Sequence, residues 1–116
     1  MPTYTDPAHW ASLVKMSLSR FFVLHALHRH PMHGYELSRV IADITHGCCA
    51  PSEGALYPML KELEQTGCLS SHAEIVGGRE RKCYTLTPDG ERAYKEAAQA
   101  WSSAAHLILV ATGHTR

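Results

Sequence analysis

The feature that most constrains the fold is a change of hydrophobic period near residue 69. Before that point apolar residues recur three or four positions apart, as they do in amphipathic helices. The segments LSSHAEIV and RKCYTLT that follow alternate around a GGRE tip, which is typical of a β-hairpin with a glycine-rich turn. Helical spacing then returns towards the C-terminus. The pattern therefore predicts a mainly α fold with one small β-hairpin.

Two helical segments open the chain. Asp6 is a suitable N-cap and Pro7 a suitable first-turn residue for a short helix through AHWASLVKM. The next segment, SLSRFFVLHALHRH, is expected to form a separate helix with a broad apolar face. Ser17 or Ser19 is its expected cap, and Pro31 ends it.

The next two helices are joined by a short polar turn. HGYELSRVIADI begins at Gly34. Its expected buried stripe consists of Tyr35, Leu37, Val40, Ile41 and Ile44. After THGCCAPSEG, Ser52 caps a helix that runs to about Gln65, and Gly67 ends it. Two helices in this arrangement, followed by a hairpin, predict a winged helix-turn-helix.

The hairpin register follows if the four GGRE residues form the tip. One face would then hold Leu69, Ala73, Ile75, Tyr84 and Leu86. His72 and Cys83 are expected on the opposite face.

A final helix is expected to start with Thr87 as cap and Pro88 in its first turn. Its apolar stripe consists of Tyr94, Ala97, Trp101, Ala104 or Ala105, and Ile108. Small residues permit close approach of a partner helix, and the LILV segment leaves apolar surface to be covered, which indicates dimerisation. The expected organisation is an N-terminal helical extension (1–17), a winged helix-turn-helix (18–87) and a C-terminal dimerisation helix (88–116).

Composition limits the class of protein. The chain has 116 residues, of which 45% are hydrophobic and 19% charged, which is the range of one globular domain. Lys+Arg and Asp+Glu both total 11, so bulk charge alone gives no argument for nucleic-acid binding. No apolar run approaches the roughly 18 residues of a membrane span, and the N-terminus lacks a signal-peptide pattern. We therefore expect a cytoplasmic protein, without membrane association, whose cysteines are reduced.

The second helix of a helix-turn-helix pair enters the major groove of DNA with its N-terminal residues foremost. Small residues there, including Gly54, let the backbone approach, and nearby polar side chains reach phosphates. The candidates on this helix are Ser52, Gly54, Tyr57 and Lys61. The wing adds the basic residues Arg79, Arg81 and Lys82, which can reach a groove or the flanking phosphates.

Three segments together resemble the PadR family of transcriptional regulators. They are MHGYELSRVI, PSEGALYPMLKELEQTGCL and GGRERKCYTLTPDGE, and the resemblance runs from about Leu18 to Tyr94. It implies a winged-helix homodimer that binds a palindromic operator and represses until an effector arrives. It also implies that Tyr35, Ser52, Gly54, Tyr57 and Lys61 lie at or near the DNA backbone, with Arg79 and Arg81 on the wing.

The resemblance suggests a role for the unusual Tyr57-Pro58 pair. Proline inside a helix removes one backbone donor and crowds the preceding turn. We expect the Tyr57 hydroxyl to reach a DNA phosphate from a place where the hydrogen bond lost at Pro58 is tolerated.

The resemblance also implies pairing through the C-terminal helices, where some family members hold flat aromatic ligands. The candidates for the dimer interface and an aromatic effector are Trp10, Tyr94, Trp101 and Ile108. Trp101 either stacks on such an effector or serves only as interface core.

Cysteines and histidines leave an alternative open. His46, Cys48 and Cys49 lie together in THGCC, and thiolates and imidazoles bind zinc, copper(I) or thiophilic metalloids. A thiol pair can also act as a redox switch. Adjacent cysteines, however, lack the two-residue gap that suits tetrahedral zinc. The two interpretations are a thiol-based metal, metalloid or redox sensor, and cysteines that are structural.

Two other classes of protein fit the sequence less well. An enzyme is not expected, because the sequence holds no nucleophile elbow, phosphate loop or metal-hydrolase motif. A winged-helix protein-interaction module without DNA binding is compatible with zero net charge. The basic wing and Lys61 argue for DNA instead.

Overall fold

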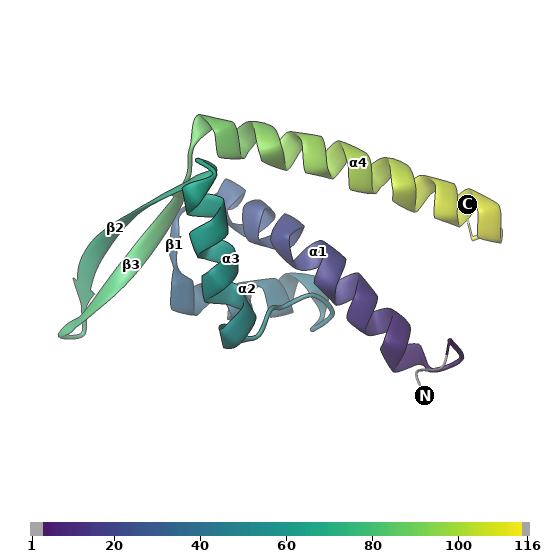
Figure 1. The fold of residues 1–116 in the computed structure, drawn as a ribbon, viewed down its shortest axis with the longest axis horizontal. Coiled ribbons are helices and arrows are strands. Elements are labelled where there is room, and N and C mark those ends of the chain that lie inside the picture. Colours follow the sequence, from purple (N-terminus) through teal and green to yellow (C-terminus); the bar gives the residue numbers. More distant parts are fainter. Residues whose placement is uncertain (1–3, 115–116) are drawn as a thin grey trace.

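The structure is a computed structural model, and it describes residues 4–114 of the chain. Four helices pack together, and a small antiparallel sheet lies at one side of them with its hairpin projecting outward (Figure 1). The elements are α1 (Pro7–Arg29), β1 (Met32–His33), α2 (Gly34–Thr45), α3 (Glu53–Gln65), β2 (Leu69–Val76), β3 (Arg79–Leu86) and α4 (Pro88–Thr112). This is the predicted winged helix-turn-helix, with β2 and β3 as the wing. Among the described residues, no helix is long and apolar enough to cross a membrane.

The N-terminal part of the chain forms one helix where two were expected. α1 is continuous across residue 17, because no proline or glycine interrupts it between Ala8 and Arg29. The prediction that Ser17 or Ser19 caps a second helix is wrong. Ser19 is buried in mid-helix, and its hydroxyl donates to the carbonyl of Lys15 at 2.6 Å.

The caps of α3 and α4 are as predicted. The Ser52 hydroxyl accepts a hydrogen bond from the Ala55 N–H at 3.3 Å, and the Thr87 hydroxyl accepts one from the Gly90 N–H at 3.0 Å. Gly67 follows the C-terminus of α3 in a left-handed conformation, with φ of 84°. The chain therefore turns sharply from α3 into the wing.

The wing is tighter than predicted. Its tip is the pair Gly77-Gly78, with φ of 59° and 78°, so the strands extend to Val76 and Arg79 and the expected four-residue GGRE tip is wrong. The predicted faces are nevertheless confirmed, because shifting the register by two residues leaves every side chain on its own side. His72 pairs with Cys83 on one face, and Leu69 pairs with Leu86 on the other.

A short strand that the sequence did not predict completes the sheet. β1 pairs with β3 in the strand order β1-β3-β2, with Met32 opposite Tyr84 and His33 opposite Cys83. It fixes the start of α2 against the base of the wing.

The core lies where α1, α2, α3 and the sheet meet. Its most deeply buried side chains include Val23, Leu37, Ile41, Leu56 and Leu60. Tyr35 was predicted to belong to the buried stripe of α2, and that prediction is wrong: it is 47% exposed. Tyr35 stands in the first turn of α2, beyond the edge of the core and beside the wing.

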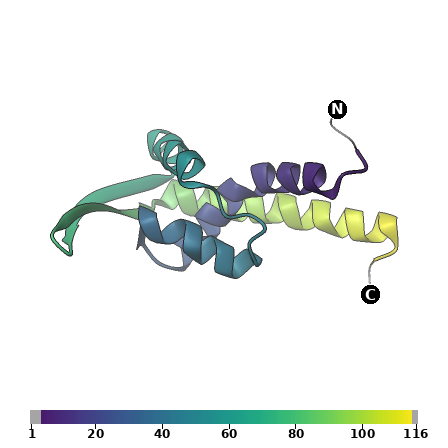
Figure 2. The same ribbon diagram turned by 90° about the horizontal axis from the view of Figure 1, so that it is seen from below.

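The wing and the outer ends of α1 and α4 lie at opposite ends of the long axis (Figure 2). The chain measures 51 × 33 × 24 Å along its principal axes. The first turn of α4 packs closely against the turn after α3. A Cβ on Gly90 would lie only 2.1 Å from the carbonyl oxygen of Cys68. The molecule therefore has two separate surfaces, one at each end.

Candidate nucleic-acid interface

The N-terminal half of α3 is exposed along one side. Ser52, Gly54, Tyr57 and Lys61 all lie on this side, as expected of a recognition helix. A Cβ on Gly54 would meet no atom within 4 Å, so internal packing does not require a glycine there. The absence of a side chain at Gly54 matters only for something that approaches from outside.

The Tyr57 ring lies against the backbone at the start of α2. A Cβ added to Gly34 would lie 3.0 Å from Cε1 of Tyr57 and 3.3 Å from its hydroxyl oxygen. Gly34 therefore makes room for the ring, and the contact limits where the hydroxyl can point. The sequence presents Gly34 as the start of a helix, and only the structure gives it this second role.

Pro58 follows Tyr57 on the solvent side of α3. It lacks the N–H that would otherwise bond to the carbonyl of Gly54 one turn earlier. Gly54 is exposed, so water can satisfy that carbonyl and the cost of the proline stays local.

Tyr35 and Arg81 lie in contact. The Arg81 guanidinium carbon is 4.8 Å from the centroid of the Tyr35 ring, and that ring in turn stacks on His33 with centroids 5.5 Å apart. A cation held over an aromatic face is attracted by the ring's quadrupole. The start of α2 and the wing are thus joined by a short stack of side chains.

These elements enclose a cleft of about 800 Å³ between the start of α2, α3 and the wing. Five of the predicted DNA-contacting residues line it, namely Tyr35, Tyr57, Lys61, Arg81 and Lys82. Ser52 lies in a neighbouring hollow of about 420 Å³ that it shares with Tyr35 and Tyr57. Gly54 and Arg79 line neither hollow. Most of the predicted site is therefore gathered in one place.

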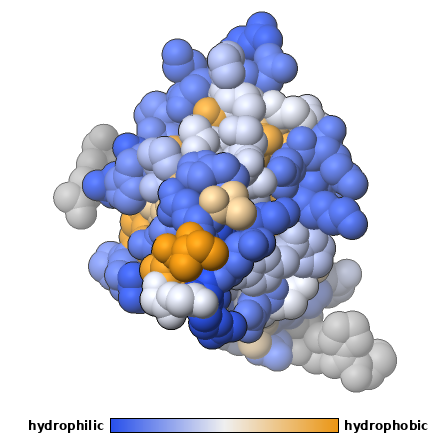
Figure 3. All heavy atoms as spheres, turned by 90° about the vertical axis from the view of Figure 1, so that its left-hand side faces the viewer, coloured by the Kyte–Doolittle hydropathy of each residue, from blue (hydrophilic) through white to orange (hydrophobic). Residues whose placement is uncertain are grey.

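The wing end of the molecule is mostly hydrophilic, with one compact hydrophobic cluster (Figure 3). The exposed large hydrophobic residues of the wing are Ile75 and Val76. Among residues 4–114, no ion pair involves Lys61, Arg79 or Lys82. Their positive charges are therefore available to an anion.

Two carboxylates at the base of the wing, Glu36 and Glu74, already accept hydrogen bonds from histidines. The backbone N–H of His33 donates to Glu36 at 3.0 Å, and this bond lowers the pKa of the Glu36 carboxyl. Hydrogen bonds from His72 and then His33 lower the pKa of Glu74. The bond to Glu74 raises the pKa of His33 above its ordinary value. With a carboxylate at each ring nitrogen, His33 is held as a donor at both.

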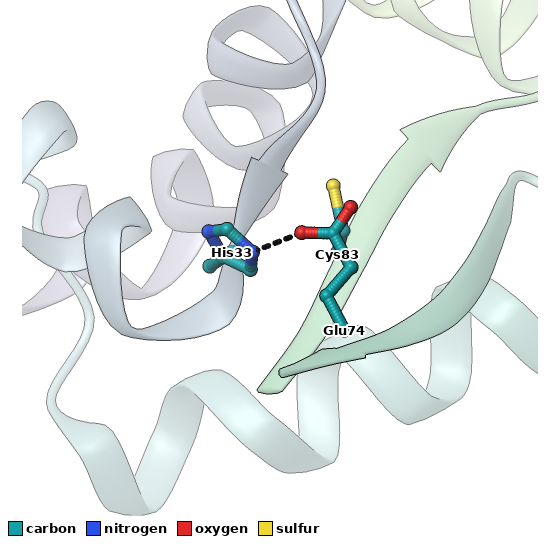
Figure 4. A group of neighbouring side chains, drawn as sticks. All are labelled: His33, Glu74 and Cys83. Atoms are coloured by element: carbon teal, nitrogen blue, oxygen red, sulfur yellow. Dashed lines mark hydrogen bonds and ion pairs between the residues drawn. The ribbon is translucent and has the colours of Figure 1, made fainter. Parts of the chain in front are cut away.

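The same region contains a group of metal-ligating side chains that the sequence did not predict as a site. The ligand atoms of His33, Glu74 and Cys83 all lie within 4.8 Å of one another (Figure 4). Burial raises the pKa of the Cys83 thiol, as do the nearby charges of Glu74 and Glu36. The hairpin pattern predicted on which face of the sheet Cys83 lies, but nothing in the sequence predicted that His33 lies beside it.

The metal candidates chosen from the sequence lie elsewhere. His46 caps the C-terminus of α2 in a left-handed conformation, and Cys48 is exposed in the following turn. Cys49 is 1% exposed, and burial, followed by a hydrogen bond with Cys48, raises its pKa to about 12. In the described part of the chain these three residues do not form a ligand group. Cys49 is held as a thiol, which is a poor nucleophile.

A second candidate surface lies at the other end of the molecule. α1 and α4 pack together near the C-terminus of α1 and separate towards their outer ends (Figure 1). Between them is an apolar groove of about 540 Å³. The predicted residues Trp10, Trp101 and Ile108 line it, and Tyr94 does not. The Tyr94 hydroxyl instead lies 2.8 Å from Nδ1 of His25, and its ring stacks on His28 and Phe21.

Taken together, a helix-turn-helix whose second helix is exposed, a basic wing beside it and a tyrosine-lined cleft between them define a winged-helix DNA-binding protein. The chain belongs to the PadR family, since residues 23–96 match the family described as "Transcriptional regulator PadR-like family". It is a transcriptional regulator, which is a non-enzymatic role.

Individual relatives agree with this assignment. The chain is 35% identical over 96 residues to the transcriptional regulator Rv3488 of Mycobacterium tuberculosis, covering 83% of this chain and 87% of that protein. It is 34% identical to the transcriptional regulator YqjI of Escherichia coli, but covers only 36% of that longer protein and 66% of itself.

Among solved structures, a PadR family transcriptional regulator from Eggerthella lenta superposes with a TM-score of 0.75 at 29% identity. The match covers 92% of this chain and 88% of that one. A transcriptional regulator from Clostridium thermocellum gives a TM-score of 0.73 at 26% identity, with 82% and 93% covered.

Proposed function

We propose that this regulator is a cytoplasmic homodimeric repressor that binds a palindromic operator. α3 enters the major groove, and the wing contacts the flanking phosphates. The observation that carries the proposal is the position of the Tyr57 ring against Gly34, in the cleft that Lys61, Arg81 and Lys82 also line. A tyrosine fixed in this way offers its hydroxyl to a phosphate at little cost in side-chain entropy.

The apolar groove supports pairing with a second copy of the chain. α4 continues past the body of the molecule, and its last turns expose Leu107, Ile108, Leu109 and Val110. Trp10 and Trp101 remain 50% and 39% exposed at the groove. A contiguous apolar surface of this kind needs cover, and a partner's α1 and α4 would supply it with the same chemistry. Two-fold pairing would present two α3 helices to successive major grooves about one helical turn apart.

An effector would act through the same groove. Its lining is almost wholly apolar and includes two indole rings, which suits a flat aromatic molecule. A molecule that binds there would change how the two subunits meet and so the spacing of the recognition helices. Release from the operator then follows as a shift between two dimer geometries.

The test of DNA recognition is Tyr57→Phe, with Tyr4→Phe as a matched control that makes the same chemical change on an exposed tyrosine before α1. Binding is measured by fluorescence anisotropy on a labelled duplex from the gene's own upstream region, at several salt concentrations. Loss of one hydrogen bond to a charged phosphate, worth about 1.5 kcal/mol, should raise Kd about tenfold. Tyr4→Phe should leave it unchanged.

Thermal melts of both variants establish that they remain folded. An unaltered Kd for Tyr57→Phe would remove the phosphate role from Tyr57 while leaving DNA binding in place. Failure of the wild-type chain to bind any duplex in a salt-dependent manner would contradict the proposal as a whole.

A further inference from the structure

Three potential ligands lie in one row across the sheet. Cys83 on β3 is directly opposite His33 on β1 and directly opposite His72 on β2. Residues opposite one another in adjacent strands share a face, and neighbouring strands lie about 4.8 Å apart. The three side chains therefore project from the same side of the sheet, with the cysteine between the two histidines.

Glu74 brings a carboxylate to the same place. It follows His72 by two residues on β2, so it lies on the same face. One carboxylate oxygen is 2.7 Å from Nε2 of His33, and the other is 2.8 Å from Nε2 of His72. Figure 4 shows His33, Glu74 and Cys83 coming together from three different strands.

We propose that His33, Glu74 and Cys83 form a binding site for a divalent transition metal such as Zn²⁺, with His72 as the fourth ligand. The donors are Nε2 of His33, a Glu74 carboxylate oxygen, the Cys83 sulfur and Nε2 of His72. Mixed nitrogen, sulfur and oxygen donors in a four-coordinate arrangement suit zinc and its borderline neighbours.

The charges in such a site balance. On binding, the Cys83 thiol loses its proton to solvent, as does the Nε2 nitrogen of His33 if it carries one. One thiolate, one carboxylate and two neutral imidazoles then carry a charge of −2, which a divalent cation neutralises. A monovalent or a trivalent cation would leave net charge beside the partly buried sheet face.

The surroundings of His33 already suit a metal ligand. Its Nδ1 lies 3.0 Å from the Glu36 carboxylate, which also accepts from the His33 backbone N–H. A histidine that binds a metal through one nitrogen commonly donates from the other to a carboxylate, which fixes the ring. Glu36 would keep this role when Nε2 turns from Glu74 to the metal.

For His33, Glu74 and Cys83 the rearrangement that binding requires is small, whereas the His72 ring lies outside this group and has to turn towards it. Two ligands of a tetrahedral zinc lie about 3.5 Å apart, given zinc–ligand distances of about 2.0–2.3 Å. His33 and Glu74 are 2.7 Å apart, and the ligand atoms of all three residues lie within 4.8 Å. Cys83 and His33 are largely enclosed, whereas the Glu74 and His72 side chains are 40% and 59% exposed and leave a way in for the ion.

The ligands would join two parts of the DNA-binding unit. His33 directly precedes α2, while Glu74, Cys83 and His72 belong to the wing. Next to His33, Tyr35 carries the stacked Arg81 of the wing. A bound metal would therefore fix the wing relative to α2. We expect this to change operator affinity, an expectation that rests on the proposed function.

The primary experiment measures metal binding without DNA. The reduced, metal-free full chain is titrated with Co²⁺, and the near-ultraviolet thiolate-to-cobalt charge-transfer band is followed by absorption. We expect one Co²⁺ per chain, a band that saturates, and its loss when Zn²⁺ is added. Absence of the band, together with no heat of Zn²⁺ binding by calorimetry, would overturn the proposal.

Variants assign the ligands. Cys83→Ser should abolish the band, and Cys48→Ser, at an exposed cysteine outside the site, should retain it. The opposite result would place the metal in the α2–α3 turn and overturn the proposal. Because Cys83 is buried and its loss could disturb folding, Glu74→Gln is a second test, with Glu53→Gln on the first turn of α3 as its matched control. We expect Glu74→Gln to weaken Co²⁺ binding at least tenfold and Glu53→Gln to leave it unchanged; equal affinities would exclude Glu74 as a ligand.

The effect on DNA is measured separately, as operator affinity with Zn²⁺ and with a chelator. A chain that binds Co²⁺ but no duplex would retain the metal site and refute the proposed function. A chain that binds duplex but no metal would refute the metal site and leave the proposed function standing.

Discussion

The wing end and the α1–α4 groove are both exposed, yet they expose different chemistry. The wing end offers tyrosines and basic side chains around a polar cleft that also contains Glu64 and Glu80. Two further carboxylates of this end, Glu36 and Glu74, are bound by histidines. The groove offers two tryptophans and a run of aliphatic side chains. A formal net charge of zero conceals this difference, because it averages over surfaces that face opposite ends of the molecule. What each surface can bind follows from its local composition.

The comparison indicates which interactions each end can form. Phosphates are attracted over a distance by unpaired cations, and that attraction weakens as salt is added. Apolar grooves are buried by direct contact with a partner, and salt does not screen this hydrophobic interaction as it screens charges. Substitutions at the two ends should therefore differ in the property they change, oligomeric state at one end and salt-dependent affinity at the other.

The largest expected effect comes from placing a charge in the groove. Ile108→Glu puts a carboxylate on a surface that we propose to be buried between two subunits. We expect the dimer dissociation constant to rise at least about 30-fold, which corresponds to about 2 kcal/mol. Sedimentation velocity over a range of protein concentrations measures the change, and operator affinity should fall with the loss of dimer.

The matched control for that variant is Ala100→Glu, which adds the same charge to an exposed position of α4 outside the groove. It should leave the dimer intact. Equal sedimentation of the two variants would mean that the groove is not the dimer interface.

The next effect concerns the junction between the two ends. Gly90→Ala would place a Cβ 2.1 Å from the carbonyl oxygen of Cys68, an approach that only movement of the backbone can relieve. We expect a loss of about 1–3 kcal/mol in the free energy of unfolding, measured by denaturant titration. Gly54→Ala is the control, because a Cβ there would meet nothing within 4 Å. A loss of stability at position 54 as large as that at position 90 would argue against a steric cause.

Local signals in the sequence were sufficient for most of the fold. Ser52 and Thr87 are caps with a short-range mechanism, so their roles follow from their immediate neighbours. The faces of the wing follow from alternation, and they survived an incorrect tip because an even shift preserves them. Such features depend only on residues close together in the chain.

Features that depend on distant pairing were missed. β1 has two residues, which is too short to show a period, yet it brings His33 beside Cys83 and creates the ligand group. Tyr35 has the spacing of a buried stripe, but its ring lies beside the wing, where Arg81 packs over it, and it stays 47% exposed. The break predicted within α1 is a different, local error, since serines that can cap a helix can also lie inside one.

The candidate site divides in the same manner. The exposed side of α3 was predictable, because exposure follows from helical spacing and the recognition role of that helix. The contact that holds Tyr57 in place was not predictable, since Tyr57 and Gly34 are 23 positions apart in the sequence. The stack of Arg81 on Tyr35 joins residues 46 positions apart, and it forms only because the wing lies beside α2.

The smallest expected effect comes from removing a single positive charge at one end of the molecule or the other. Lys61→Ala removes a cation from the cleft, and Lys95→Ala removes one from the exposed side of α4. Lys61→Ala should weaken operator binding by at most about fivefold, which corresponds to about 1 kcal/mol for an exposed ion pair. It should also reduce the slope of log Kd against log salt concentration by about one, because one fewer counterion is released from DNA. Lys95→Ala should change neither quantity. If both variants altered the slope equally, the protein would be responding to total charge, and the division of its surface into a DNA-binding end and a pairing end would have no electrostatic basis.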